Sequence, residues 1–408
     1  MIAAFLLTAS GCWSRRETQI LTINSALGFD RTTASGKNQL LLSVLTLKPS
    51  TAMGGGGMTG GQGGGRKQAT AGQVISAPGA TIEDAIRNWE LRSSRHLFLA
   101  HTMVLVIGED LAKEGIGQII DFCMRDKDVP LRCWVVICRG MARDALQSLP
   151  EFEPLVSTEI ANIQHKSTSF VSKTARENVL NIFYDLMTPG REALVAYMKT
   201  FIPPEKSSAA QKGSTGGGSQ GEADDQGKTF LLSGAAALRG DKMVGTLSEI
   251  ETQGALLLKN QARGGVIPVS CDSYHPNVSY LLRNAKTRVR PTVSPNGRIR
   301  IEVTIKGTGE MIEEEDSVLD ITKEESLKKL EALISREVER RCLLAVNKAK
   351  AFKADVFGFG DLIHHTEPEV WKEIAGSWDD IFPDLEVKIS AKFTVEQPGL
   401  IDQPIEAK

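Results

Sequence analysis

Two stretches in the last third of the chain alternate strictly between apolar and polar residues, and this pattern limits the fold more than any other feature. Residues 298–306 carry isoleucine or valine at every second position, and residues 386–396 repeat the alternation. Successive side chains of a β-strand point to opposite faces, so each stretch predicts a strand with one buried and one solvated face. Such half-buried strands are typical of antiparallel sheets, and we expect antiparallel pairing here.

A long helix is predicted between these two strands. Residues 322–325 (TKEE) resemble a helix cap, and apolar residues then recur at helical spacing from Leu327 to Ala349. One amphipathic helix that covers one face of a sheet is an α+β arrangement. We therefore expect an α+β protein of three mixed domains, each with helices packed on a largely antiparallel or mixed sheet.

The first half of the chain mixes predicted strands and helices. Short apolar runs indicate buried strands, and the amphipathic segments between them indicate helices packed on a sheet. The expected strands are residues 40–47, 103–107 and 133–138, and the expected helices begin at Thr81, span 109–124 and fill most of 159–201.

Two low-complexity stretches divide the sequence. Residues 54–65 (GGGGMTGGQGGG) predict a flexible loop, since the Gly-Lys-Ser/Thr ending of a phosphate-binding loop is missing. Residues 207–227, rich in Gly, Ser and Gln, predict the main domain boundary. The expected organisation is a signal peptide (1–11), an N-terminal α/β domain (12–150), a helix-rich middle domain (151–206), a linker (207–227) and a C-terminal α+β domain (228–408).

Composition argues against several functional classes. The chain has 48 basic and 50 acidic residues, a formal charge of -2, so we predict no nucleic-acid partner. It has six cysteines, and setting Cys12 aside leaves an odd number, which argues against a disulfide framework. Apolar neighbours favour buried thiols, and the absence of any CxxC spacing argues against zinc.

The N-terminus predicts export and a lipid anchor. Residues 1–11 form an apolar run that ends in small residues, as in a secretory signal, and Cys12 follows directly. This resembles the lipobox of bacterial lipoproteins, in which the cysteine is acylated. The favoured leucine is replaced by Ala9, and the missing basic start is compatible with a start codon further upstream. The alternative is a buried apolar strand with an incidental cysteine; no later segment has the length of a membrane span.

Histidines occur in two groups that invite a metal or catalytic interpretation. On a strand, His96 and His101 would point to opposite faces, which favours structural or surface roles. His364 and His365 follow Asp361, and the Asp-x-x-His spacing could place Asp361 and His364 on one helical face, but a solvated helix end is favoured. The sequence has no GxSxG, HExxH or nucleotide-binding glycine motif, so we predict no catalytic residue, no metal site and no cofactor.

Two further motifs have competing interpretations. Residues 313–316 (EEED) lack the alternating acidic spacing of a calcium loop, which favours a solvated turn. The aromatic–glycine repeat at 357–360 (FGFG) either lets a loop pack closely or exposes an apolar contact, and packing is favoured.

Several blocks, in order, resemble the Ger(x)C spore germination lipoproteins, the C subunits of spore nutrient receptors. They are residues 11–17 (GCWSRRE), 26–30 (ALGFD), 93–108 (SSRHLFLAHTMVLVIG), 240–245 (GDKMVG) and 355–360 (DVFGFG), followed by Trp371 and Trp378. The resemblance covers nearly the whole chain outside the glycine-rich insertions. It implies three α/β-type domains on the outer surface of the spore inner membrane. It also implies two partners, a polytopic membrane subunit and a second, membrane-embedded subunit.

Three functional hypotheses follow. The first is a non-catalytic receptor subunit, anchored by lipid on Cys12 and needed for nutrient-triggered germination through protein–protein contacts. The second is an independent surface lipoprotein that binds a small solute between domains. The third is a secreted hydrolase centred near Asp361 and His364. The sequence identifies neither the nutrient nor the surface that meets the partners.

Overall fold

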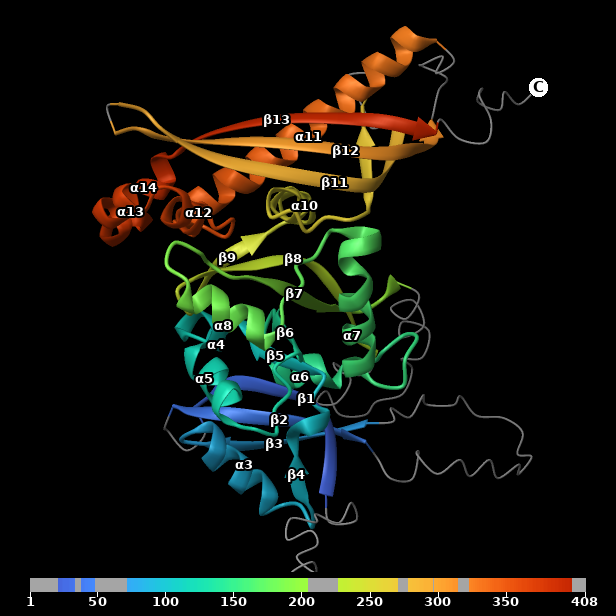
Figure 1. Cartoon of the computed structure of the whole chain (residues 1–408). Helices are drawn as coiled ribbons and strands as arrows, with labels where there is room; N and C mark the ends of the chain where they lie inside the picture. The colour runs from blue at the N-terminus through green and yellow to red at the C-terminus, as the bar shows by residue number, and fades with distance from the viewer. Residues whose placement is uncertain are drawn as a thin grey trace, which may run out of the picture.

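The computed structural model describes residues 21–33, 38–47, 72–204, 227–270, 278–295, 297–314 and 323–397. Within these residues the strands form two sheets, which lie toward opposite ends of an elongated molecule (Figure 1). The first sheet has nine strands in the order β3-β2-β1-β5-β6-β7-β8-β9, with β4 also paired to β1. These strands are β1 (Leu21–Thr32), β2 (Gln39–Leu47), β3 (Gly72–Gly79), β4 (His96–Phe98), β5 (Val104–Gly108), β6 (Trp134–Cys138), β7 (Leu194–Phe201), β8 (Thr229–Arg239) and β9 (Lys242–Leu247).

The first sheet is parallel in its centre and antiparallel at both ends. Strands β1, β5, β6 and β7 pair in parallel, whereas β2 and β3 at one end and β8 and β9 at the other pair antiparallel. Strands β5 and β6 are buried at every position. Such continuous burial is expected where helices cover both faces of a parallel sheet.

Helices do cover both faces of this sheet. One face packs with α3, α4, α5 and α8, and the other with α6 and α7. These helices are α3 (Ile82–Glu90), α4 (Glu109–Glu114), α5 (Gly117–Arg125), α6 (Ala142–Gln147), α7 (Val156–Lys166) and α8 (Val179–Met187).

Two helix starts show how local sequence sets this architecture. The Thr81 hydroxyl accepts a hydrogen bond from the Asp84 N–H at 3.2 Å, so α3 begins at the predicted cap. The buried carboxylate of Asp30, on β1, accepts from the N–H groups of Ala142 (2.6 Å) and Arg143 (3.0 Å) at the start of α6. Asp30, the last residue of the family-like block 26–30, therefore joins the first sheet to α6.

The second sheet has the order β10-β11-β12-β13 and is covered by the 29-residue helix α11 (Glu324–Phe352). Apolar side chains of β12 meet the helix in a dry layer, where Ile301, Val303 and Ile305 are at most 1% exposed. The helix also protects the β13 edge: oxygens of Glu331, Ser335 and Glu339 accept hydrogen bonds from backbone N–H groups of that strand. The strands are β10 (Val266–Val269), β11 (Val278–Val293), β12 (Ile299–Glu314) and β13 (Glu386–Gln397).

Helix α10 (Glu249–Leu258) lies between the two sheets (Figure 1) and is buried along most of its length. It crosses α11 very closely, since a β-carbon on Gly254 would lie 2.2 Å from the Arg341 carbonyl oxygen. Three short helices follow α11 on one side of this layer (Figure 1): α12 (Phe359–Thr366), α13 (Pro368–Ile374) and α14 (Trp378–Ile381). The two sheets are thus joined through a helical layer.

The mixed helix-and-sheet class is confirmed, and so are the strands predicted at 40–47, 103–107, 133–138, 298–306 and 386–396. The expectation of buried thiols is confirmed for the four cysteines at 123, 133, 138 and 342, which are free and buried. The expected long helix is present as α11, with Lys323 as its N-cap and no side-chain hydrogen bond there; the predicted cap, Thr322, lies outside the described residues.

Two local predictions were wrong. Residues 109–124 form two helices, α4 and α5, because the chain turns at Gly115 with φ of +141°, a backbone conformation that L-residues rarely adopt. Residues 194–201 are the strand β7 rather than helix. Five successive buried residues at its start suit a central strand covered on both faces, and periodicity alone does not separate such a run from a buried helix.

The pairing of the second sheet also differs from the expectation. Strands β12 and β13 are parallel. An apolar–polar alternation fixes which face is buried and leaves strand direction open. Here the intervening helices form a crossover long enough to return the chain in the same direction.

The topology also bears on the predicted linker at 207–227. The strands on either side of it, β7 and β8, are antiparallel neighbours in the first sheet. The first sheet therefore continues past the linker as far as β9, and the connection to the second sheet runs through α10. The division into domains 12–150, 151–206 and 228–408 stays a prediction, but residues 229–247 belong to the first sheet by pairing.

Candidate functional site

The family-like block at 355–360 forms a buried turn organised by one carboxylate. Asp355 is 2% exposed and accepts hydrogen bonds from the backbone N–H groups of Gly358 (3.0 Å) and Gly360 (2.7 Å). It also accepts from the indole N–H of Trp378 at 3.2 Å. Burial raises the pKa of Asp355 to about 6, and these donors oppose the rise. A single acidic residue thus fixes the turn, the start of α12 and the position of α14.

This turn is joined to the loop between α8 and β7 of the first sheet. The Glu192 N–H donates to the Asp355 carbonyl at 3.0 Å, and the Asp361 N–H donates to the Gly190 carbonyl at 3.1 Å. A β-carbon on Gly190 would lie 2.7 Å from the Gly360 carbonyl carbon, so the two backbones touch where both residues lack a side chain. We call this contact, residues 188–192 against 355–361, the junction.

Aromatic side chains pack beside the junction. Trp371 and Trp378 meet edge to face with ring centroids 5.6 Å apart, and Trp378 also contacts Phe382. Phe359 is 1% exposed and stacks on the partly buried Phe357 at 5.1 Å. The packing interpretation of the FGFG motif is therefore confirmed for Phe359.

A polar cavity of about 450 Å³ opens next to the junction, between α8 and the end of α10. Its lining includes two acidic residues, Glu177 and Asp185, two basic residues, Arg191 and Lys259, and the apolar Phe357. Arg191 ion-pairs with Asp185 at 3.6 Å. Among the described residues, no Lys or Arg nitrogen lies within ion-pair distance of Glu177, which is only 3% exposed.

Burial dominates the electrostatics of these carboxyl groups. It raises the pKa of Glu177 to about 7; nearby Lys259 lowers it and Asp185 raises it further. Burial likewise raises the pKa of Asp185, against the opposing effect of Lys259 and Arg191. Burial also raises the pKa of Glu192 to about 7, although the Gly240 N–H donates to its carboxylate at 2.7 Å. Glu177 and Asp185 are thus buried carboxyl groups that share one cavity with Arg191 and Lys259.

The structure brings the predicted group of Asp361, His364 and His365 together at α12. One ligand atom from each lies within 4.8 Å of the others, the carboxylate being buried and both histidines exposed. However, one oxygen of Asp361 binds the Arg191 guanidinium at 2.7 Å, and His364 stacks on Trp371. Because Arg191 already pairs with the Asp361 carboxylate and His364 packs on Trp371, we interpret these side chains as part of the junction rather than as a metal site or a hydrolytic centre.

The remaining predicted residues lie elsewhere. His96 on β4 contacts Glu90 at 3.4 Å, and His101 packs against Phe98; both histidines are exposed. Cys12, the Gly-rich residues 54–65 and the last two residues of the acidic run at 313–316 lie outside the described residues. The first two residues of that run, Glu313 and Glu314, end the strand β12, so the expected turn does not begin there.

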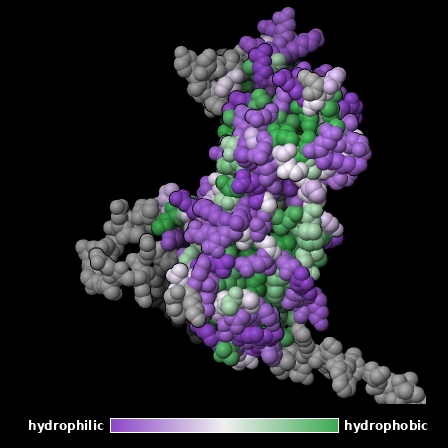
Figure 2. All heavy atoms as spheres, turned by 90° about the vertical axis from the view of Figure 1, so that its left-hand side faces the viewer, coloured by the Kyte–Doolittle hydropathy of each residue, from purple (hydrophilic) through white to green (hydrophobic). Residues whose placement is uncertain are grey.

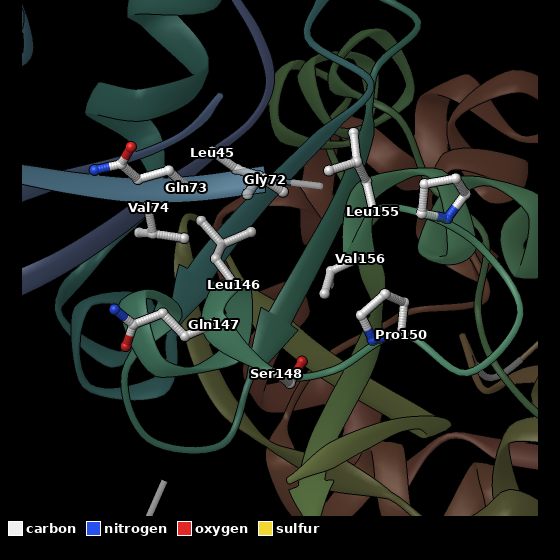
Figure 3. Close-up of a pocket in the computed structure, with 11 residues that line it drawn as sticks. Leu45, Gly72, Gln73, Val74, Leu146, Gln147, Ser148, Pro150, Leu155 and Val156 are labelled. Carbon is white, nitrogen blue, oxygen red and sulfur yellow. The ribbon is translucent and has the colours of Figure 1, made fainter. Parts of the chain in front are cut away.

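A second cavity, of about 260 Å³, lies in the first sheet unit and has no charged residue in its lining (Figure 3). Leu45 and Val74 come from β2 and β3, and Leu146 and Val156 come from α6 and α7. Its lining also includes the polar side chains of Gln73, Gln147 and Ser148, so it is an uncharged cavity of mixed polarity, in contrast to the charged cavity at the junction.

Sequence reasoning found the junction turn but missed the cavity. Glu177, Asp185 and Lys259 are scattered over more than 80 positions and belong to no motif. The one available signal was the Thr188-Pro189-Gly190 break, which marks the loop that carries Arg191. Only the packing of α10 beside α8 brings the two signs of charge together.

In the described part of the chain, no helix is both long enough and apolar enough to cross a membrane. Two family models match in order. The first, described as "Spore germination protein N-terminal domain", covers residues 14–200; the second, "Spore germination B3/ GerAC like, C-terminal", covers residues 233–399.

Curated relatives from Bacillus subtilis (strain 168) match over nearly the whole length. Spore germination protein KC is 26% identical over 98% of this chain and 95% of its own. Spore germination protein YndF is 25% identical over 98% of this chain and 96% of its own. The crystal structure of the GerBC protein superposes with a TM-score of 0.55 at 18% identity, covering 91% of this chain and 98% of that one, so the fold is shared. The chain belongs to the Ger(x)C family of spore germination proteins.

Proposed function

We propose that the chain is the lipid-anchored C subunit of a spore germinant receptor and works through protein–protein contacts rather than catalysis. The observation that carries this proposal is the ordered match of two germination-protein models to residues 14–200 and 233–399, with full-length similarity to spore germination proteins KC and B3. The buried turn of Asp355, which carries the most specific block, is occupied by structural hydrogen bonds. Its role is then to hold the two sheets in a fixed relation for binding partners.

The proposed location is the outer surface of the spore inner membrane, held by lipid on Cys12. Strand β1 begins at Leu21, nine residues after Cys12, and its start pairs with β4. Strand β4 lies toward the end of the molecule far from the second sheet (Figure 1). Two or more acyl chains give a stable anchor without a membrane-spanning helix. The proposed partners are a polytopic membrane subunit and a second membrane-embedded subunit.

Replacement of Cys12 tests this proposal in spores. The gene is deleted in a strain whose other nutrient receptors have been removed, and is then restored as the natural sequence or as Cys12→Ala. We expect the natural sequence to restore nutrient-triggered germination and to fractionate with membranes, and the variant to do neither. Full germination with Cys12→Ala protein absent from the membrane fraction would contradict the proposed anchor. Unchanged germination after deletion, across a panel of amino acids and sugars, would contradict the receptor role.

The charged cavity favours a second candidate function, the binding of a small solute between the two halves of the chain. Its lining holds both acidic and basic side chains, which suits a solute that carries both charges, and about 450 Å³ is enough for a small molecule. A ligand that binds only the folded state raises the thermal midpoint. The test is a thermal scan of the purified protein with amino acids and sugars, in the natural sequence and in Glu177→Gln. A rise in the natural sequence that is lost in the variant would support this function.

A further inference from the structure

One face of the second sheet carries an unusual excess of positive charge. Toward the far end of β12, the outward face of this sheet carries Glu310, which pairs with Arg283, and the exposed Ile312. The central part of the face turned away from α11 (residues 284–292, 300–308 and 386–394) presents fifteen residues of β11, β12 and β13, of which seven are basic, two are acidic and none is apolar. We call it the basic face. Its basic residues are Lys286, Arg288, Arg290, Arg300, Lys306, Lys388 and Lys392, all exposed, and its acidic residues are Glu302 and Glu386.

The strand register places like charges directly beside one another on this face. Lys286 is opposite Lys306, and Lys306 is opposite Lys392, so three lysines form a row across three neighbouring strands. In the described part of the chain, the basic face holds one ion pair, Arg300 with Glu386 at 2.9 Å. Like charges directly opposite in a sheet are destabilising. The basic face therefore has a net excess of five positive charges, although the formal charge of the whole chain is -2. The repulsion between these charges lowers the stability of the folded state.

The composition of the basic face indicates what it binds. Protein–protein interfaces are enriched in aromatic residues and depleted of lysine, and their energy is concentrated in buried anchors. This face has four lysines and neither an aromatic nor an aliphatic side chain among its fifteen residues. Serine, threonine and asparagine fill its other positions, and the upper part of the molecule, where this sheet lies, is largely hydrophilic (Figure 2). An extended layer of anionic head groups fits such a face better than a specific protein partner does.

We propose that the basic face docks on the surface of an anionic phospholipid bilayer. This inference rests on the proposed membrane location and adds a second contact to it. The second sheet and β4, to which the start of β1 is paired, lie toward opposite ends of the molecule (Figure 1). The basic face and the lipid on Cys12 would therefore hold the protein along the membrane at two separate points. Lipid anchors and basic patches are both signals that bind proteins to membranes, and proteins combine them.

Vesicle co-sedimentation tests the inference with full-length protein carrying Cys12→Ala, which removes the lipid and so separates this contact from the proposed anchor. The vesicles contain either phosphatidylglycerol with phosphatidylcholine or phosphatidylcholine alone. We expect binding to the anionic vesicles only, and we expect it to weaken steeply with salt. Lys286→Gln, Lys306→Gln and Lys392→Gln together should weaken it roughly a hundredfold, with a thermal midpoint equal to or above that of the parent.

A matched control changes the same number of charges on the first sheet unit. Lys127→Gln, Arg132→Gln and Lys242→Gln are exposed substitutions away from the basic face, and together they should change binding less than about threefold. Equal loss in both triple variants, or no loss in the lysine-row variant, would overturn the proposal. So would equal binding to neutral vesicles. Binding to duplex DNA or polyglutamate without binding to anionic vesicles would assign the face to a different polyanion and would also refute it.

Discussion

Glu177 offers the sharpest test of the electrostatics at the junction. Glu177 is only 3% exposed, and burial raises the pKa of its carboxyl group from the ordinary value of 4.5 to about 7. Each unit of pKa corresponds to about 1.4 kcal/mol. The ionised side chain therefore lowers the free energy of unfolding by about 3 kcal/mol above pH 7. Glu177→Gln keeps the shape of the side chain and removes this cost.

The pH dependence has a definite sign. Between pH 4.5 and about 7 the folded state holds the Glu177 proton more tightly than the unfolded chain does, so the natural protein loses stability as pH rises through this window. We expect Glu177→Gln to be more stable by about 3 kcal/mol at pH 8 and by less than about 0.5 kcal/mol at pH 4.5. Glu373→Gln, at an exposed position of α13, is the matched control.

Urea unfolding followed by tryptophan fluorescence at both pH values measures the difference. Trp371 and Trp378 lie beside the junction, so the signal reports on the region that changes. A Glu177→Gln protein that is no more stable than the natural one at pH 8 would refute the reasoning. So would a gain that is independent of pH, because the argument attributes all of it to ionisation.

Three other substitutions test the packing by the same unfolding measurement. Trp378→Phe removes a donor to the buried Asp355 carboxylate and should cost about 1–3 kcal/mol, whereas Trp371→Phe, whose indole N–H has no hydrogen-bond partner among the described residues, should cost less. Gly254→Ala should cost about 1–3 kcal/mol, since the added carbon meets the backbone of α11; a neutral result would mean that the two helices separate freely. Asp30→Ala should lower the free energy of unfolding by about 2 kcal/mol, because two N–H groups at the start of α6 lose their acceptor. Unchanged stability would mean that water replaces the carboxylate as the acceptor.

The most specific family-like block turns out to be architectural. The polar groups of residues 355–360 form hydrogen bonds within the turn and with the loop at 190–192. A block of this kind sets the relation between the two sheets, and we propose that the surfaces that bind partners lie outside it. The basic face and the charged cavity are two such surfaces with different chemistry, and each has its own test.

Local pattern was enough to predict much of the secondary structure. The alternation at 298–306 and 386–396 shows which residues face α11, because the two-residue period of a strand is a property of the backbone. The capping sequence at Thr81 correctly placed the start of α3, since the cap bonds only to its own helix. The ordered family-like blocks also predicted the family, which the two matching family models confirm.

Where a segment's environment decided its structure, local pattern failed. Residues 194–201 became a central strand because both of their faces are covered, and 109–124 broke at Gly115 because the chain turns there against Asp241. Strand direction in the second sheet depended on a crossover of some seventy residues, which an alternating pattern does not encode.

The sequence alone determined the α+β class, the family and the prediction of an anchor at Cys12. Only the tertiary structure decided that β7 and β8 are neighbours across the predicted linker, that Glu177 and Lys259 face one cavity, and that three lysines stand in a row. The physical reason is the range of the interactions. Periodicity and capping act within a few residues, whereas burial, pKa shifts and like-charge contacts arise between side chains that only the folded chain brings together.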